Sequence, residues 1–365
     1  MKKILFGFLF SLILIFEFSS SVKAQDNSQI PQEEFEKAEV LSIDKQGVLD
    51  SDGIKVKFQN LTLKIISGSD TNKIIKLQNG GQTFITDAGL VKSGEVLILD
   101  KVSNNFLIVD KYRLNYIPYL LIGFVLLLII VAGWKGLGSI LGLIISLAVI
   151  LGFIIPQIIN GSNPLLIAIT GSSVILLVST YLAHGISKQT TIALTSTFIA
   201  LIIASILSVF AVNFTKLAGI GDDAAVSLLT ASSTSSINLQ GLLLAGIIIG
   251  TLGALNDITT TQSATIFELH ATNKNLKFHE LIKKGSRVGK EHIVSLVNTL
   301  VLAYAGSSLA IFIYFVLNPS KQPLWVVLNN EILIDEVVRT VAGTCGLILA
   351  IPICTYIASW WVTKK

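Results

Sequence analysis

Long apolar runs dominate the chain from Tyr116 to Val362, and they limit its possible folds more than any other feature. A helix needs about 20 apolar residues to cross the hydrocarbon core of a bilayer. Every backbone amide in that core must be paired, and runs of this length achieve this most simply as helices. The sequence predicts about seven transmembrane helices, at residues 116–134, 137–158, 165–184, 191–214, 239–259, 292–317 and 332–362.

Composition agrees with a membrane protein and argues against a soluble enzyme. The chain has 365 residues, a mean hydropathy of +0.73 and only 14% charged residues, whereas soluble domains carry about 25%. The net charge of +4 is modest, and the basic residues are spread out or lie beside predicted spans. We therefore expect the lipid bilayer as a partner, and no nucleic acid.

Residues 1–24 have the pattern of a signal peptide. Lys2 and Lys3 precede an apolar core at residues 4–16, and Val22 and Ala24 occupy the positions that a signal peptidase inspects. Glu17 ends an apolar core of about 13 residues, which is short for a span. An uncleaved anchor helix is the alternative.

Residues 25–113 are expected to form a small exported β-rich domain. Alternating residues predict strands at 54–58 and 61–66, and the stretches 96–100 and 106–110 flank a predicted hairpin turn. Turn signals occur at residues 52–53 and 79–80. A compact barrel, for example an OB-like one, fits this pattern. The region has no cysteine, so it must fold without disulfides. It is either a purely structural module or the site of a protein partner.

Basic residues predict the orientation of the bundle, residues 114–365. An exported N-terminal domain places Lys135, Lys188, the basic segment 271–290 and the C-terminal lysines in the cytoplasm, and leaves Lys216 and Lys321 outside. Positive charge thus accumulates inside, as the topology rule requires. Segment 271–290 is expected to be a topology-setting loop, with an amphipathic helix on the inner leaflet as the alternative.

An acid within apolar sequence marks the candidate site. Residues 224–256 carry no charge, and after Asp257 the next charged residue is Glu268. An ionised carboxylate at the centre of a membrane helix costs about 2.5 to 3.5 kcal/mol on insertion scales. Small, hydroxylated and acidic residues share a stripe with it: Gly250, Gly253, Asp257, Thr261, Ala264 and Glu268, with Thr260 beside it. We expect this face to lie against other helices or water.

The chemistry of this stripe suits a hard cation or a proton. Asp257 and Asn256 are the candidate binding residues, and the hydroxyls of Thr260 and Thr261 would add neutral oxygen ligands. In the alternative interpretation, Asp257 ends the helix at the cytoplasmic interface and reaches water.

Two other spans contain polar residues that complete the candidate site. Asn298 and Thr299 lie in the sixth span, with Glu291 at its cytoplasmic end, and this face is expected to meet Asp257. Asn298 could equally form a single interhelical hydrogen bond. Arg339 begins the last span; either it pairs locally with the acids one turn earlier, or it serves as a countercharge for a substrate.

No pattern of catalytic or metal-binding residues stands out. Residues 219–222 read GIGD, as in intramembrane aspartyl proteases, but the four preceding spans supply no second aspartate. The four histidines lack metal-site spacing and have no Ser-His-Asp arrangement. Cys345 and Cys354 lie on opposite faces of one predicted helix, which excludes a disulfide within it. We expect neither an enzyme nor a bound metal or cofactor.

Three sequence blocks resemble the YibE/F family of bacterial multi-pass membrane proteins. They are GTLGALNDITTTQSATIFEL, GSRVGKEHIVSLVNTLVLAYAGSSL and EVVRTVAGTCGLILAIPI, and the resemblance covers residues 107–361. The matched positions are Gly253, Ala254, Asp257, Ser263, Glu268, Gly285, Gly289, Asn298, Thr299, Tyr304, Gly306, Arg339, Gly343, Gly346 and Pro352. Residues 259–262 depart from the family pattern, which has serine and alanine after the acid.

The resemblance implies a bacterial cytoplasmic-membrane protein with a bundle of seven or eight helices, and it supplies no known substrate. Two functions fit the sequence. The first is an ion or small-solute transporter with a polar site around Asp257. The second is a membrane scaffold or sensor whose exported β domain binds a partner. Oligomeric state does not follow from the sequence.

Overall fold

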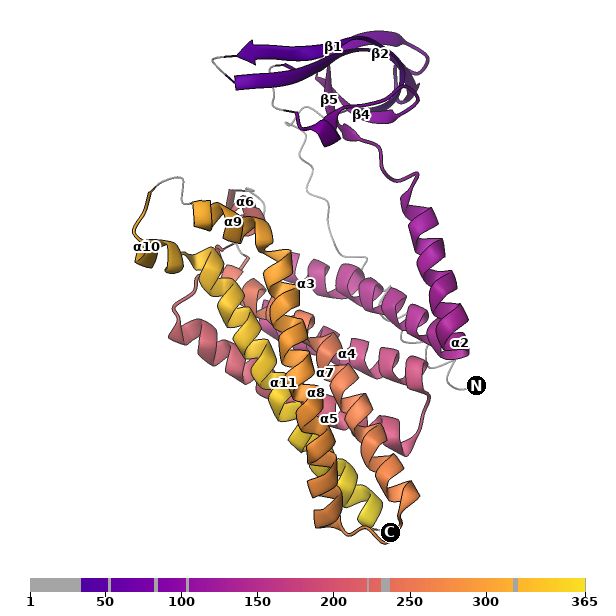
Figure 1. The fold of residues 1–365 in the computed structure, drawn as a ribbon, viewed down its shortest axis with the longest axis vertical. Coiled ribbons are helices and arrows are strands. Elements are labelled where there is room, and N and C mark those ends of the chain that lie inside the picture. Colours follow the sequence, from indigo (N-terminus) through magenta and orange to yellow (C-terminus); the bar gives the residue numbers. More distant parts are fainter. Residues whose placement is uncertain are drawn as a thin grey trace. The chain divides into compact units, whose positions relative to one another are not determined.

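The protein consists of two compact units, which the computed structural model describes separately (Figure 1). Described are residues 34–51, 54–81, 85–102, 105–221, 223–230, 237–317 and 321–364. One unit, Ala24–Leu127, contains the β domain, and the other contains Leu128–Lys365. The expected signal peptide at residues 1–24 and the aspartate of the GIGD string lie outside the described residues.

The β domain is one antiparallel sheet of five strands in the order β3-β2-β1-β4-β5. Its strands are β1 (Glu34–Ser51), β2 (Ile54–Ser67), β3 (Ile74–Gly80), β4 (Val96–Val102) and β5 (Asn105–Lys111). The expected strands at 54–58 and 61–66 form one strand, β2. The expected hairpin between β4 and β5 is confirmed by the pairing of Val102 with Asn105. The edge strands β3 and β5 approach each other, so the sheet is a half-barrel.

Alternation along the strands builds the core of this half-barrel. Leu61, Leu63 and Ile65 of β2 are fully buried, whereas the residues between them are partly exposed. Gln59 extends the sheet with its side chain: its Oε1 accepts from Val91 N at 2.8 Å, and its Nε2 donates to Val91 O at 3.1 Å. A buried amide thus holds the long connection before β4 in the manner of a neighbouring strand.

A lysine joins two acids on the surface of the β domain. Lys101 Nζ lies 3.1 Å from Glu34 Oε2 and 2.8 Å from Asp70 Oδ2. The hydrogen bond from Lys101 lowers the pKa of both carboxyls. These acids therefore remain ionised to lower pH than isolated carboxyl groups do.

The second unit is helical. Helix α2 (Ile117–Val149) begins in the first unit and continues into this one. The other elements are the π-helix η3 (Ile150–Ile154), α3 (Ile155–Ile159), α4 (Pro164–His184), α5 (Lys188–Phe214), α6 (Asp223–Thr230), α7 (Leu239–Thr272), α8 (Phe278–Ser307), α9 (Leu309–Leu317), α10 (Leu324–Leu328) and α11 (Glu331–Thr363). Among the described residues, five helices are long and apolar enough to cross a membrane, or six if α8 and α9, bent by 64°, form one span.

Two of the expected spans are joined in one helix. Residues 116–134 and 137–158 were expected as separate spans, but α2 runs through both, and the run to Ile159 is 43 residues long. Gly133 interrupts the helical backbone between them, with φ of 58° and ψ of −139°. Glycine tolerates such a conformation, which side chains disfavour. The predicted boundary between the two spans therefore corresponds to a break within one helix.

Side-chain caps define where the other long helices begin. Asn163 caps α4, Ser187 caps α5, Asn238 caps α7 and Asn330 caps α11, each by accepting a backbone N–H of the first turn. Such caps satisfy donors that a helix leaves unpaired at its start. The expected starts of α4, α5, α7 and α11 consequently lie within a few residues of the observed ones.

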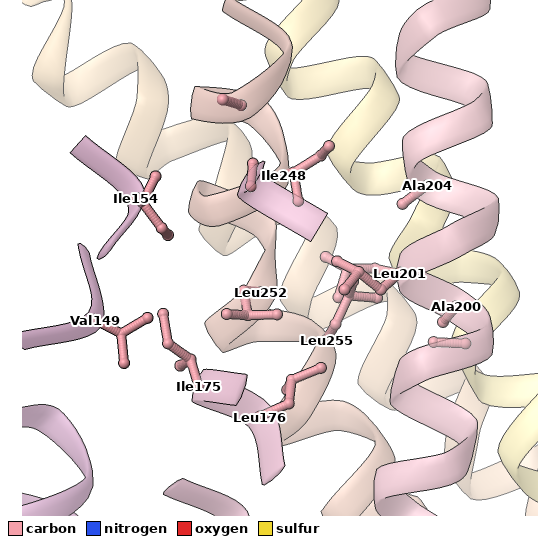
Figure 2. Close-up of a cluster of buried hydrophobic side chains, with 14 of the residues drawn as sticks. Val149, Ile154, Ile175, Leu176, Ala200, Leu201, Ala204, Ile248, Leu252 and Leu255 are labelled. Atoms are coloured by element: carbon pink, nitrogen blue, oxygen red, sulfur yellow. The ribbon is translucent and has the colours of Figure 1, made fainter. Parts of the chain in front are cut away.

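The core of the bundle lies around α7, which packs against α4, α5, α8 and α11. Figure 2 shows part of it, where Leu252 and Leu255 of α7 lie near Leu176 of α4 and Leu201 of α5. Small residues bring α11 close to its neighbours: a Cβ on Gly346 would lie 2.6 Å from Ala204 of α5. Such close approach is typical of membrane helix interfaces.

The basic segment 271–290 differs from the expected loop. Helix α7 continues to Thr272 and α8 already begins at Phe278, so most of the segment is helical. Leu281, Gly285 and Gly289 are buried, and a Cβ on Gly285 would lie 2.2 Å from Ile266 of α7. The start of α8 therefore packs against the bundle on one face and exposes its lysines on the other.

Candidate functional site

Helix α7 carries the candidate site, and the structure divides its polar residues between two faces. Thr259, Gln262 and Ser263 are buried. The stripe that contains Asp257 and Thr261 is exposed at the surface of this chain. The two faces differ in their partners as well as in their burial.

The buried face forms hydrogen bonds to neighbouring helices. Asn256 Oδ1 accepts from Thr180 Oγ1 of α4 at 2.8 Å. Thr259 shares a hydroxyl hydrogen bond with Thr197 of α5. These contacts give Asn256, a predicted site residue, a partner within the bundle and so a role in helix packing.

Gln262, one turn further along, joins three helices. Its Nε2 donates to Gly285 O of α8 at 3.0 Å and to Thr355 Oγ1 of α11 at 2.7 Å. Ser263 Oγ donates to Gln189 O of α5 at 2.9 Å. Of the residues 259–262 that depart from the family pattern, Thr259 and Gln262 therefore connect helices, whereas Thr260 and Thr261 donate only within α7.

Asp257 lies in the middle of α7, not at its end. It is exposed at the surface of the chain, and no described residue donates a hydrogen bond to its carboxylate. His184, at the last turn of α4, is close enough to interact with it electrostatically. The interpretation of Asp257 as a helix terminus is wrong, because α7 continues as far as Thr272.

A polar cavity of about 450 Å³ lies next to this part of α7. Thr260 and Thr261 line it, and both hydroxyls donate back to α7 carbonyls, of Asn256 and Asp257, at 2.8 Å. The remaining lining residues come from α2, α4, α5 and α7: Lys135, His184, Ser187, Gln189, Thr190, Ala193 and Ala264. Its volume falls within the range of small-molecule sites.

Local sequence explains why these groups meet. Gly185 follows α4 with a φ of +75°, which turns the chain sharply. Ser187 then caps α5, accepting from Thr190 N at 3.1 Å. The last turn of α4 and the first turn of α5 therefore lie together beside α7, and the cavity also reaches Lys135, just after the break in α2.

The predicted residues of α8 are not brought to this place. The packed face of α8 contains Gly285, Gly289 and, further along, Leu296. Glu291, Asn298 and Thr299 are all exposed. The expectation that the Asn298 face meets Asp257 is therefore wrong, because glycines and leucines form the contact surface instead. Thr299 donates only within its own helix, to Ser295 O at 2.9 Å.

Glu268 is exposed on the last turns of α7 and is not among the residues that line the cavity. It lies eleven positions beyond Asp257, so about 16 Å of helix separates the two acids. Glu268 thus stands apart from the other predicted residues of α7.

Arg339 also lies away from Asp257. Its guanidinium Nε is 4.0 Å from Glu336 Oε1, so the local ion pair that we expected is present. A Cβ on Gly246 would lie 3.8 Å from Arg339. Gly246 and Asp257 are separated by about 16 Å along α7, so Arg339 belongs to a different part of the bundle.

A carboxylate site that sequence reasoning missed lies at the start of α11. Glu331 Oε1 accepts from three consecutive backbone N–H groups, those of Ala218, Gly219 and Ile220, at 2.9, 2.8 and 3.1 Å. Such a nest of amides holds an anion strongly. Gly219 has a φ of +82°, so the glycines of the GIGD string were the available signal.

The second glycine of that string permits another close contact. A Cβ on Gly221 would lie 2.2 Å from Asp335 Oδ2. Asp335 is 6% exposed. The string therefore has a structural explanation, in which its glycines admit two carboxylates of α11.

The described residues contain no group of three or more His, Cys, Asp and Glu side chains that could hold a metal ion. Cys345 and Cys354 are both free. Cys354 is buried, and its thiol donates to Thr259 O at 3.3 Å. Its place is in the packing between α7 and α11.

Comparison with known proteins identifies the family. The family model of the YibE/F-like protein matches residues 120–364. No curated protein and no solved structure matches the chain. The match covers more than half of the chain and includes the helices around α7, so the protein belongs to the YibE/F-like family.

Proposed function

We propose that this protein transports an ion or a small solute across the bacterial cytoplasmic membrane, using the polar site around Asp257. The observation that carries the proposal is the cavity of about 450 Å³ beside Asp257, lined by Thr260, Thr261 and His184. A carboxylate on a membrane helix without a hydrogen-bond donor is costly unless water or a ligand reaches it. Asp257 does not itself line the cavity, but it is exposed next to the lining residues Thr260 and Thr261, and we propose that water or a ligand reaches it from this side.

The break in α2 supports the seven membrane crossings that we propose. A helix of 43 residues is about 65 Å long, more than twice the hydrocarbon thickness. Divided at Gly133, it supplies two spans, and α4, α5, α7, the bent pair α8 and α9, and α11 supply the others. This count agrees with the apolar runs of the sequence.

The distribution of charge supports an exported β domain and a cytoplasmic C-terminus. Lys135 and His184 line one cavity at the start of α5. The same end of the bundle contains the start of α8, where Phe278 stacks edge-on against Tyr356 near the end of α11. Basic side chains thus gather at one end, which is the cytoplasmic end by the positive-inside rule.

Reconstitution tests the transport function. Purified protein in proteoliposomes would be assayed for flux of protons, Na⁺ and inorganic phosphate, and Asp257→Asn compared with Glu268→Gln. Asp257→Asn should reduce flux at least about tenfold, equivalent to about 1.4 kcal/mol, while Glu268→Gln leaves it near wild type. Equal flux in wild type and Asp257→Asn would refute the role of Asp257.

A scaffold or sensor is the second candidate, and the long β1–β2 hairpin favours it. Near the end of this hairpin Val48 and Leu49 are 54% and 42% exposed. Exposed apolar side chains on a protruding ribbon suit a protein partner. Crosslinking in cells tests this candidate: Val48→Lys with Leu49→Lys should abolish any crosslinked partner while the bundle remains in the membrane.

A further inference from the structure

A lysine and a histidine line the cavity beside Thr260 and Thr261. Lys135 comes from α2, and His184 from the last turn of α4. Lys135 forms no salt bridge with any described residue. Asp257, which lies close enough to His184 to interact with it electrostatically, does not itself line the cavity, and the charged side chain that does is Lys135.

Hydrogen-bond donors add to this charge. Ser187 and Thr190 share a hydroxyl hydrogen bond of 2.8 Å, and whichever donates, the other keeps an O–H for a ligand. Thr190 is only 4% exposed. The hydroxyls of Thr260 and Thr261 already donate to carbonyl oxygens of α7, so these two residues line the cavity without offering a donor to a ligand.

The start of α5 also favours an anion in this cavity. Ser187, Gln189 and Thr190 all line the cavity, and they surround the N-terminus of α5, which begins at Lys188. The helix dipole places partial positive charge at this end. The helix end strengthens a site that Lys135 and His184 already define.

We propose that this cavity binds a small oxyanion, a phosphate or carboxylate group, between Lys135, His184 and the Ser187–Thr190 hydroxyl pair. The inference rests on the proposed function only in placing the ligand on the transport route. The cavity can hold an anion whether or not Asp257 drives flux. Inorganic phosphate is the simplest probe, because it matches clustered N–H, O–H and ammonium donors.

Direct binding tests the site apart from transport. Calorimetric titration of the full chain in phosphatidylcholine nanodiscs with inorganic phosphate should give a Kd below about 1 mM. Lys135→Gln and His184→Gln should each weaken binding about tenfold or more, whereas Lys135→Arg retains it. Lys188→Gln is the matched control, since Lys188 lines a neighbouring apolar pocket instead, and it should change Kd less than twofold.

The outcomes separate the two proposals and the two sources of the anion. Loss of phosphate binding in phosphatidylglycerol nanodiscs would identify a lipid headgroup as the occupant, whereas unchanged binding identifies a free anion. Absence of binding for both phosphate and acetate at 10 mM, which is about ten times the expected Kd, or equal loss in Lys188→Gln, overturns the site. Flux that depends on Asp257 without such binding would leave the transport proposal standing and remove this one.

Discussion

Glu331 and Asp257 are carboxylates on two helices of one bundle, and their surroundings are opposite. Glu331 accepts three backbone N–H groups from the loop at residues 218–220. Asp257 has no hydrogen-bond donor among the described residues and lies beside a cavity. A carboxylate oxygen that accepts three backbone N–H groups stabilises the fold, whereas a carboxylate without such donors next to a cavity is available for a ligand or a proton. Acidic residues in membrane helices should therefore be classified by their donors before a function is assigned.

The largest expected effect breaks the bonded carboxylate. Glu331→Ala should lower the free energy of unfolding by about 2 kcal/mol, because it leaves three N–H groups without their acceptor. Glu331→Gln keeps an acceptor oxygen and should lose less. Thermal unfolding in detergent, followed by tryptophan fluorescence, measures both.

The unbonded carboxylate provides the contrast in the same assay. Asp257→Asn and Asp257→Ala should change the free energy of unfolding by less than about 0.5 kcal/mol, because they remove no hydrogen bond. If Asp257→Ala destabilises the protein as much as Glu331→Ala does, the distinction between a structural and an available carboxylate fails.

A smaller effect on the free energy of unfolding is expected for Gln262, whose buried polar side chain is uncharged. Gln262→Leu removes hydrogen bonds to α8 and α11 and should cost about 1 kcal/mol. Thr265→Val is the control, since the hydroxyl of Thr265 donates only to Thr261 O within α7. Equal unfolding temperatures for the two variants would show that the amide does not connect the helices.

The smallest effect concerns Glu34 and Asp70, the two carboxylates that pair with Lys101 on the surface of the β domain. Lys101 lowers the pKa of Glu34 and Asp70, so their stabilising contribution is present above the ordinary carboxyl pKa and is lost as pH falls through the lowered values. Lys101→Met should raise both pKa values toward the ordinary range. Carbon-13 titration of the carboxyl groups by NMR measures this directly, and unchanged midpoints would contradict the pairing.

Sequence reasoning located most helices but not the contacts between them. Apolar length alone placed the helix starts within a few residues, and the structure shows that side-chain caps at Asn163, Ser187, Asn238 and Asn330 fix them. The face of α8 that packs against the bundle was not predictable from the polar residues of this helix. Glycine contributes little to hydropathy, yet Gly285 and Gly289 determine which face packs. As a result, Asn298 lies on an exposed part of α8 and not in the contact with the bundle.

The candidate site was also predictable only in part from the sequence. An acid in an apolar run marks Asp257 locally, and its stripe partners follow from helical spacing. The groups that make the cavity come from three separate places in the chain: Lys135, the turn that holds His184 and Ser187, and α7 with Thr260 and Thr261. Only tertiary packing brings them together, as it does the Glu331 carboxylate and the amides of residues 218–220.

The 64° bend between α8 and α9 has a consequence for the local thickness of the bilayer. With α8 along the membrane normal, its apolar residues from 292 onward rise about 24 Å, and the nine tilted residues of α9 add about 6 Å. Together they match the hydrocarbon thickness of about 30 Å. A straight continuation would overshoot it, so in the proposed spanning arrangement the bend would let this stretch reach the opposite headgroups without distorting the surrounding lipid.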